Sequence, residues 1–244
     1  MSSQLRQAWQ TVVPDPAGRH GPLPPVLLVL TVVTGVVDAF SYLALGHVFV
    51  ANMTGNVVFL AFSIAGAPGF SIWASAVALL AFAAGAVLGG QLAHRNKAHR
   101  GKLLWAASLL ELLLMLAGYL FAQVHGDPYD GVGRYVLIVL LGLAMGCQNA
   151  AARALAVPDL TTTVLTLTIT GISADGRLAG GADSRIGRRL ISTLAMFSGA
   201  LIGGLIALHG SPPVVLLIAT ILLVTVVSVA TRLTRSTGAW VTPS

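Results

Sequence analysis

Long apolar runs separated by short polar stretches make up most of this chain. Six runs are long and apolar enough to cross a bilayer as helices, because about 20 residues span its hydrocarbon core of roughly 30 Å. They cover residues 25–45, 70–93, 103–122, 134–152, 190–208 and 213–230. Inside a bilayer only helices and closed barrels satisfy every backbone polar group. The pattern therefore predicts an all-α membrane protein with six transmembrane helices.

Two further apolar segments do not fit this series. Residues 48–66 are polar in their first half, and residues 161–173 provide only 13 positions, about 20 Å of helix. If all eight segments cross, the lysine and arginine residues number nine inside and five outside; if these two segments re-enter instead, the numbers are thirteen and one. Positive charge concentrates in cytoplasmic loops, so the second arrangement is favoured: six crossings plus two re-entrant or broken polar segments. Length alone leaves full crossing of both segments open.

The second half of the chain repeats features of the first. Asp38 corresponds to Asn149, and GAVLGG at 85–90 corresponds to GALIGG at 199–204, at nearly the same offset along the chain. Three crossings in each half give the two halves opposite orientations in the membrane. The sequence therefore predicts an inverted 3+3 repeat, an arrangement that is common in transporters.

This repeat divides the chain into two membrane units, a connecting loop and two tails. In chain order, the first tail, first repeat, loop, second repeat and second tail are residues 1–24, 25–122, 123–133, 134–230 and 231–244. The charge distribution predicts that both tails face the cytoplasm and that the loop between the repeats faces outward.

Composition narrows the class of protein further. Hydrophobic residues make up 56% of the chain and charged residues 9%, against about 25% charged in soluble domains. The net charge of +6 comes from short loops, so it indicates membrane topology and not nucleic-acid binding. Cys147 is the single cysteine, which excludes an internal disulfide or a cysteine-based metal cluster. We find no room for a soluble catalytic domain and predict neither an enzyme nor a cofactor or metal site.

Polar residues interrupt the apolar pattern at two matching places. The first half carries Asp38, Asn52, Thr54 and Asn56, and the second half carries Gln148, Asn149, Thr162, Thr163 and Thr166. Such groups are costly in hydrocarbon and commonly mark a substrate or ion pathway. We predict that Asp38, Asn52, Asn56, Asn149 and Thr163 form one polar cluster near the middle of the bilayer.

Several roles for these residues stay open. Asp38 binds a proton or cation, pairs with Arg153, or accepts hydrogen bonds from the backbone of the broken segment. The asparagines and threonines either contact a solute or only satisfy nearby backbone groups. Glu111, alone in LLELLLML, is a candidate for coupling or for a structural contact with another helix. The glycines at 85, 89, 199 and 203 favour close helix packing, within the bundle or between subunits of a homo-oligomer.

Two stretches carry a resemblance to a known family. GVVDAFSYLALGHVFVANMTGN at 35–56 resembles the signature of the YoaK-like family of small bacterial integral membrane proteins, a domain of unknown function. GCQNAAAR at 146–153, followed by TTVLT at 162–166, resembles the second conserved region of that family. The resemblance implies a multi-pass protein of the bacterial inner membrane. It implies no mechanism and no catalytic residue.

Together these patterns favour a small secondary transporter or channel. Its polar site is predicted near the membrane midplane, between the two re-entrant elements, with proton coupling through Asp38. The alternative is a membrane scaffold or regulatory subunit with no permeation path, and an intramembrane enzyme comes third. The expected partners are the lipid bilayer and a small solute or ion, whose identity, direction of transport and coupling ion the sequence leaves open.

Overall fold

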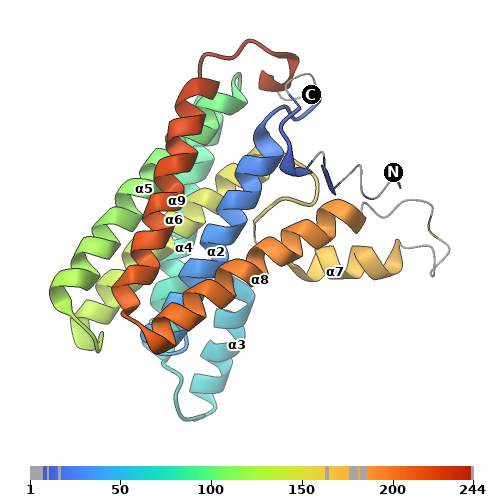
Figure 1. The fold of residues 1–244 in the computed structure, drawn as a ribbon. Helices are drawn as coiled ribbons and strands as arrows, with labels where there is room; N and C mark the ends of the chain where they lie inside the picture. Colours follow the sequence, from blue (N-terminus) through green and yellow to red (C-terminus); the bar gives the residue numbers. More distant parts are fainter. Residues whose placement is uncertain are drawn as a thin grey trace.

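The protein folds into a bundle of long helices with two shorter ones at its edges (Figure 1). The computed structural model describes residues 8–9, 11–15, 18–162, 165–175, 181 and 186–242. The long helices are α2 (Leu23–Ala44), α4 (Ile72–Arg95), α5 (Arg100–His125), α6 (Gly131–Leu155), α8 (Ile186–His209) and α9 (Pro212–Leu233). The short ones are α3 (Met53–Ile64) and α7 (Leu165–Ala174), with a 3-10 turn, η2, at Ala239–Val241.

All six long helices are apolar enough to cross a membrane, and the described residues contain no β-strand. This confirms the predicted all-α membrane fold with six transmembrane helices. The helices α3 and α7, with 12 and 10 residues, fall in the two segments that did not fit the series. The helix α3 packs against α4, and α7 against α8.

Short local signals set several helix starts. Prolines stand in the first turn of both α2 and α9, where their missing N–H groups leave no hydrogen bond unmade. The Ser71 hydroxyl accepts a hydrogen bond from the backbone N–H of Ala74 at the start of α4. The His99 ring accepts one from Lys102 at the start of α5. These caps fix where the loops end and the membrane helices begin.

A close contact between α2 and α8 depends on glycine. A Cβ atom added at Gly35 would collide with the backbone carbonyl of Met196, and one added at Gly199 would collide with the carbonyl of Val32. Backbone atoms cannot move aside as the end of a side chain can. The two helices therefore approach closely only because these positions lack side chains, as in small-residue packing between membrane helices.

The contact between α4 and α6 has the same construction. A Cβ atom at Gly146 would meet the carbonyl of Phe82, and one at Gly85 would meet the carbonyl of Leu143. Gly146 is the repeat counterpart of the glycine at 35 on α2, and Gly85 is the counterpart of the glycine at 199 on α8. The glycine contacts therefore recur at the offsets that the sequence indicated.

Arg100 gathers several helix ends at one end of the bundle. Its buried guanidinium donates to the carbonyl oxygens of Leu155 and Trp240, and it also contacts the His20 ring. The starts of α2 and α5, the end of α6 and the C-terminal turn thus lie together at what we call the Arg100 end. At the opposite end, the rings of Phe40 and Tyr129 lie 5.7 Å apart, which joins the end of α2 to the α5–α6 loop. We call this the Tyr129 end.

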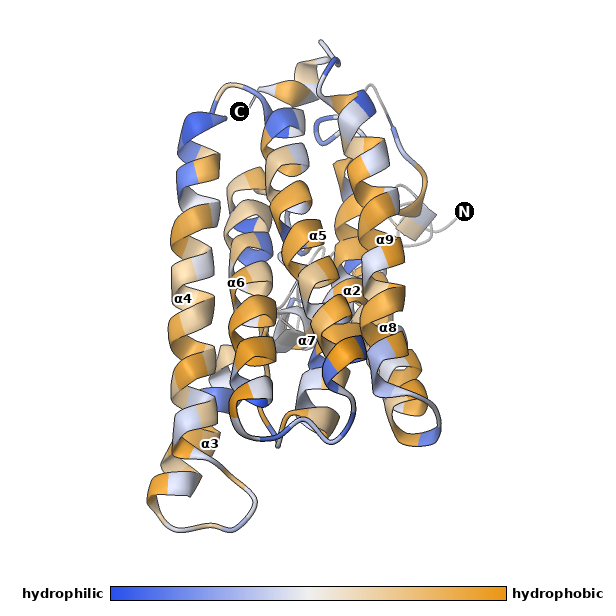
Figure 2. Cartoon of the chain, turned by 90° about the vertical axis from the view of Figure 1, so that its left-hand side faces the viewer, coloured by the Kyte–Doolittle hydropathy of each residue, from blue (hydrophilic) through white to orange (hydrophobic). Residues whose placement is uncertain are grey.

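The helices therefore alternate in direction. From the Arg100 end, α2, α5 and α8 run toward the Tyr129 end, and α4, α6 and α9 run back (Figure 1). Among the described lysines and arginines, Arg134 alone belongs to the Tyr129 end. Apolar residues cover the lengths of the helices, and hydrophilic residues concentrate toward their ends (Figure 2). Figure 2 also shows α3 reaching past the other helices at the Tyr129 end.

Candidate functional site

In the first half, Asp38 holds the chain that follows α2. Its side chain is 3% exposed. The backbone N–H groups of Val50 and Ala51 donate to its Oδ1 at 3.1 and 2.9 Å, and the side-chain amide of Asn52 donates to its Oδ2. We call these four residues the Asp38 clamp. Without it, backbone groups of this non-helical stretch would be buried with no acceptor, which is costly in a membrane.

Asn56 supports the same stretch from the first turn of α3. Its side chain is fully buried, its Oδ1 accepts from the backbone N–H of Phe49 at 2.9 Å, and its Nδ2 donates to the carbonyl of Phe49 at 2.6 Å. Asn52 and Asn56 therefore bind protein groups in this structure. Thr54, which the sequence also suggested, is exposed.

Aromatic rings cover the stretch at the Tyr129 end. Tyr42 lies 5.0 Å from Phe49 and 5.1 Å from the His47 ring, and Phe59 lies 5.2 Å from Phe70 (centroid distances). The His47 ring also forms a hydrogen bond with the carbonyl of Gly69 at 3.1 Å. We call the rings of these five residues, with Phe62, the aromatic cluster: Tyr42, His47, Phe49, Phe59, Phe62 and Phe70.

In the second half, Gln148 links the two halves. Its Nε2 donates to the hydroxyl of Thr34 on α2 at 2.7 Å, while its buried Oε1 has no partner among the described residues. The sequence did not single out Thr34. Asn149 donates to the carbonyl of Met145 at 2.9 Å, within its own helix. Asp38 thus forms its hydrogen bonds with the non-helical stretch after α2, whereas Asn149 forms this one within α6.

The threonines lie on the connection after α6 and on α7. Thr162 is buried, has a positive φ of 65°, and donates to the carbonyl of Thr161 at 2.7 Å. Thr166 is exposed on α7, and Thr163 lies outside the described residues. The hydrogen bonds among the described residues therefore form two groups, one around Asp38 and one around the end of α6.

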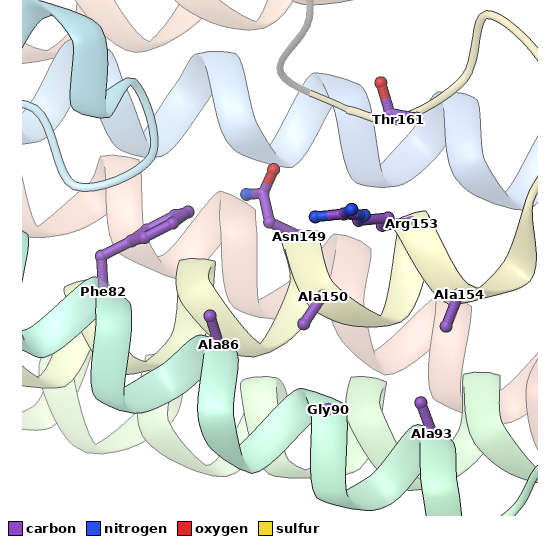
Figure 3. Close-up of a pocket in the computed structure, with 9 residues that line it drawn as sticks. All are labelled: Phe82, Ala86, Gly90, Ala93, Asn149, Ala150, Arg153, Ala154 and Thr161. Carbon is purple, nitrogen blue, oxygen red and sulfur yellow. The ribbon is translucent and has the colours of Figure 1, made fainter.

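A cleft of about 810 Å³ opens beside the second group, between α4, α6 and the connection that follows α6 (Figure 3). Small residues of α4 form one wall. Asn149 and Arg153 lie on one side of α6, and Thr161 lies on the segment across from them (Figure 3). Clefts of this size commonly bind small molecules. The sequence suggested Asn149, but it gave no signal for the α4 wall, which depends on how the two helices pack.

Arg153 is the charged residue of this cleft. It forms no ion pair with Asp38, whose oxygens accept from the clamp residues, so that suggested pairing is absent. In the part of the chain that the structure describes, Arg189 forms ion pairs with Asp159 and Asp175, at 3.0 and 2.9 Å. The described residues also contain no group of three ligands able to hold a metal ion.

Glu111 is a second buried acid, in a different environment. It is 1% exposed on α5, which packs against α6 and α9, and neither of its carboxyl oxygens has a hydrogen-bond partner among the described residues. An isolated charge at such a position is costly. The two intramembrane acids therefore differ, because one accepts three hydrogen bonds and the other accepts none.

The sequence of this chain is similar to known proteins. Residues 26–229 match the family described as "Protein of unknown function (DUF1275)". The chain belongs to this family. It is similar to the UPF0700 transmembrane protein YoaK of Bacillus subtilis (strain 168), with 33% identity over 156 residues, 63% of this chain and 68% of that protein. No solved structure matches the chain.

Membership of the DUF1275 family confirms the resemblance that residues 35–56 carry. The transmembrane relative and the six apolar helices agree that this is a multi-pass membrane protein. Within that stretch, Asp38, Asn52 and Asn56 hold the chain between α2 and α3. Within the second stretch, 146–153, Asn149 and Arg153 line the cleft. The two resembling regions thus coincide with the two polar elements of the structure.

Proposed function

We propose that this DUF1275 protein is a small secondary transporter of the bacterial inner membrane that works by alternating access. The observation that carries the proposal is a difference between two related places. The second half holds a cleft of about 810 Å³ beside Asn149, and in the first half Asp38 binds residues 50–52 directly. A transporter that works by alternating access is never open to both sides of the membrane at once.

The surroundings of two matching glycines differ between the halves. A Cβ atom added at Gly90 would meet nothing within 4 Å, whereas one added at Gly204 would lie 3.9 Å from Leu43. Leu43 is the repeat counterpart of Ala154, which lines the cleft, at the offset that relates Asp38 to Asn149. The first half thus places a leucine, 42% exposed, beside the position where the second half has the smaller alanine.

We also propose that the two halves form an inverted 3+3 repeat. In an inverted 3+3 repeat, α2, α4 and α5 correspond to α6, α8 and α9, and the members of each pair run in opposite directions. The shared glycine contacts of α2 with α8 and of α6 with α4 support this relation. The short helices α3 and α7 then follow the first long helix of each half, and α3 extends beyond the bundle at the Tyr129 end (Figure 2). Exchange of conformations between the halves would close the cleft and open its counterpart toward the Tyr129 end.

The charge distribution supports an orientation for this transporter. The Arg100 end carries nearly all the described positive residues, so we place it, with both chain termini, in the cytoplasm. The cleft beside Arg153 then opens toward the cytoplasm. The aromatic cluster closes the periplasmic side.

We further propose that a proton on Asp38 couples proton movement to transport. A proton on this carboxyl would turn one acceptor oxygen into a donor, which would weaken the clamp and release residues 50–52. Glu111 is a second candidate for binding a proton, since no donor stabilises its charged form among the described residues. Both acids lie on membrane helices, and neither lines the cleft.

The test is transport by the purified protein in liposomes. Solutes from a chemically diverse library are applied under an imposed pH gradient, and proton movement is followed with a trapped fluorescent dye. We expect at least one solute to drive a proton signal in wild-type vesicles, and Asp38→Asn to remove it while helix content is kept. Wild-type vesicles that behave as empty vesicles with every solute would contradict a transporter and favour a scaffold.

A further inference from the structure

The charge in the cleft indicates the kind of molecule that fits it. Arg153 is the ionisable residue among those that line the cleft, and no aspartate or glutamate lines it in the described part of the chain. The nearby acids on the following segment, Asp159 and Asp175, are engaged by Arg189. A ligand that enters the cleft therefore meets one positive charge and no negative charge from its described lining.

Arg153 also differs from the other basic residues at this end of the bundle. Arg100 is buried and donates to backbone carbonyls, and Lys97 is exposed in the loop after α4. Membrane topology is enough to explain the exposed Lys97, and contacts between helix ends are enough to explain the buried Arg100. Arg153 is also exposed, but it lies in the wall of the cleft, with Asn149 one turn away and Thr161 across from it (Figure 3). Its guanidinium has no ion-pair or hydrogen-bond partner in the described part of the chain.

The rest of the lining indicates the body of the ligand. The α4 wall consists of Phe82, Ala86, Gly90 and Ala93, and α6 adds Ala150 and Ala154. These residues offer an apolar surface with little obstruction and few hydrogen bonds. A strongly hydrated inorganic ion would lose water there without compensation. An anionic head on an apolar body would place each part against a matching surface.

We propose that the cleft binds an organic anion with a carboxylate or phosphate head, and that Arg153 is the residue that binds the head. Guanidinium matches both groups, because its fork of N–H donors binds two oxygens at once. Asn149 and Thr161 are placed to add hydrogen bonds to the same head. This inference rests on the proposed transporter for its physiological role, but the binding itself is measured separately. The head group belongs to a small free acid or to an anionic lipid.

The experiment measures thermal unfolding of the full chain in neutral maltoside detergent. The probes are sodium hexanoate, neutral hexanamide and hexylammonium chloride, with sodium chloride as the control for ionic strength. We expect hexanoate to raise the Tm of the wild type by about 2 °C or more at saturation, and the other probes to leave it unchanged. Arg153→Gln should lose the hexanoate shift, and Arg153→Lys should keep part of it.

The matched control is Arg95→Gln, which removes a positive charge from the same end of the bundle but outside the cleft. It should keep the full hexanoate shift. Each variant is first checked for an unchanged elution volume and an unchanged Tm without probe, so that a lost shift reports binding. An equal shift with hexanamide, no shift with hexanoate, or a full shift in Arg153→Gln would overturn the inference.

A second arm separates the two sources of the anion. The protein is placed in nanodiscs of phosphatidylcholine alone or mixed with phosphatidylglycerol. If the lipid mixture raises the Tm through Arg153 and removes the hexanoate shift, the anion is a lipid head group; a hexanoate shift in both discs supports a free acid. Anion binding without any transport in liposomes would contradict the proposed transporter but not the anion site. Transport of a neutral or cationic solute would contradict the anion site but not the transporter.

Discussion

The two polar elements of this protein stand at matching positions but are built differently. In the first half, the carboxylate of Asp38 accepts three hydrogen bonds from residues 50–52, and aromatic rings cover this stretch of the chain. In the second half, the amide of Asn149 donates within its own helix, and a cleft lies beside it. An acid, which only accepts when ionised, can gather several backbone N–H groups at once, whereas an amide divides its bonds between donating and accepting.

Side-chain size adds to this difference. Tyr42 and Leu43 are the repeat counterparts of Arg153 and Ala154. Tyr42 joins the aromatic cluster, whereas its counterpart is a charged residue in an open cleft. With these different side chains, the first half carries an aromatic cluster where the second half carries a cleft.

The largest effect should come from breaking the Asp38 clamp. Asp38→Ala leaves the N–H groups of Val50 and Ala51 without an acceptor, and each buried unsatisfied group costs about 1–3 kcal/mol. We expect the free energy of unfolding, measured by SDS titration in mixed micelles, to fall by several kcal/mol. Arg153→Ala, made in the cleft, should change the free energy by less than about 0.5 kcal/mol. Equal costs would show that the two elements do not differ as described.

The glycine contacts should give the next largest effect, and here the two halves should agree. Gly35→Ala and Gly146→Ala each force a Cβ atom onto the backbone of a neighbouring helix, and overpacking of this kind costs about 1–3 kcal/mol. Gly90→Ala is the control, because it points into open space. The same SDS titration compares all three. A costly Gly146→Ala beside a neutral Gly35→Ala would contradict the equivalence of the two helix contacts.

The sequence predicted the helices better than it predicted the site. Apolar length locates six helices, and the glycine motifs locate two close contacts, because both depend on local composition. The bonds of Asp38 to a broken backbone were among the alternatives, but the choice needed the path of residues 45–52. The pairing of Gln148 with Thr34 and the wall of the cleft depend on how helices rotate against each other, which a single sequence does not encode in its local pattern.

The smallest effect on stability should come from filling the cleft. Ala154→Leu gives the second half the side chain that Leu43 supplies in the first. Because the cleft is open, the extra volume should change the free energy of unfolding by less than about 0.5 kcal/mol. The hexanoate-dependent rise in Tm should nevertheless disappear. A full hexanoate shift in Ala154→Leu would mean that the ligand lies elsewhere.

The central claim is that the cleft beside α4 opens to the cytoplasm while its counterpart beside α8 is closed. Cysteines at Gly90 and at the matching Gly204, in a chain with Cys147→Ala, report this directly through labelling with a membrane-impermeant maleimide. We predict fast labelling of Gly90→Cys in inside-out vesicles, slow labelling in right-side-out vesicles, and slow labelling of Gly204→Cys in both. Equal labelling of the two cysteines, or faster labelling of Gly90→Cys from the periplasmic side, would contradict the account.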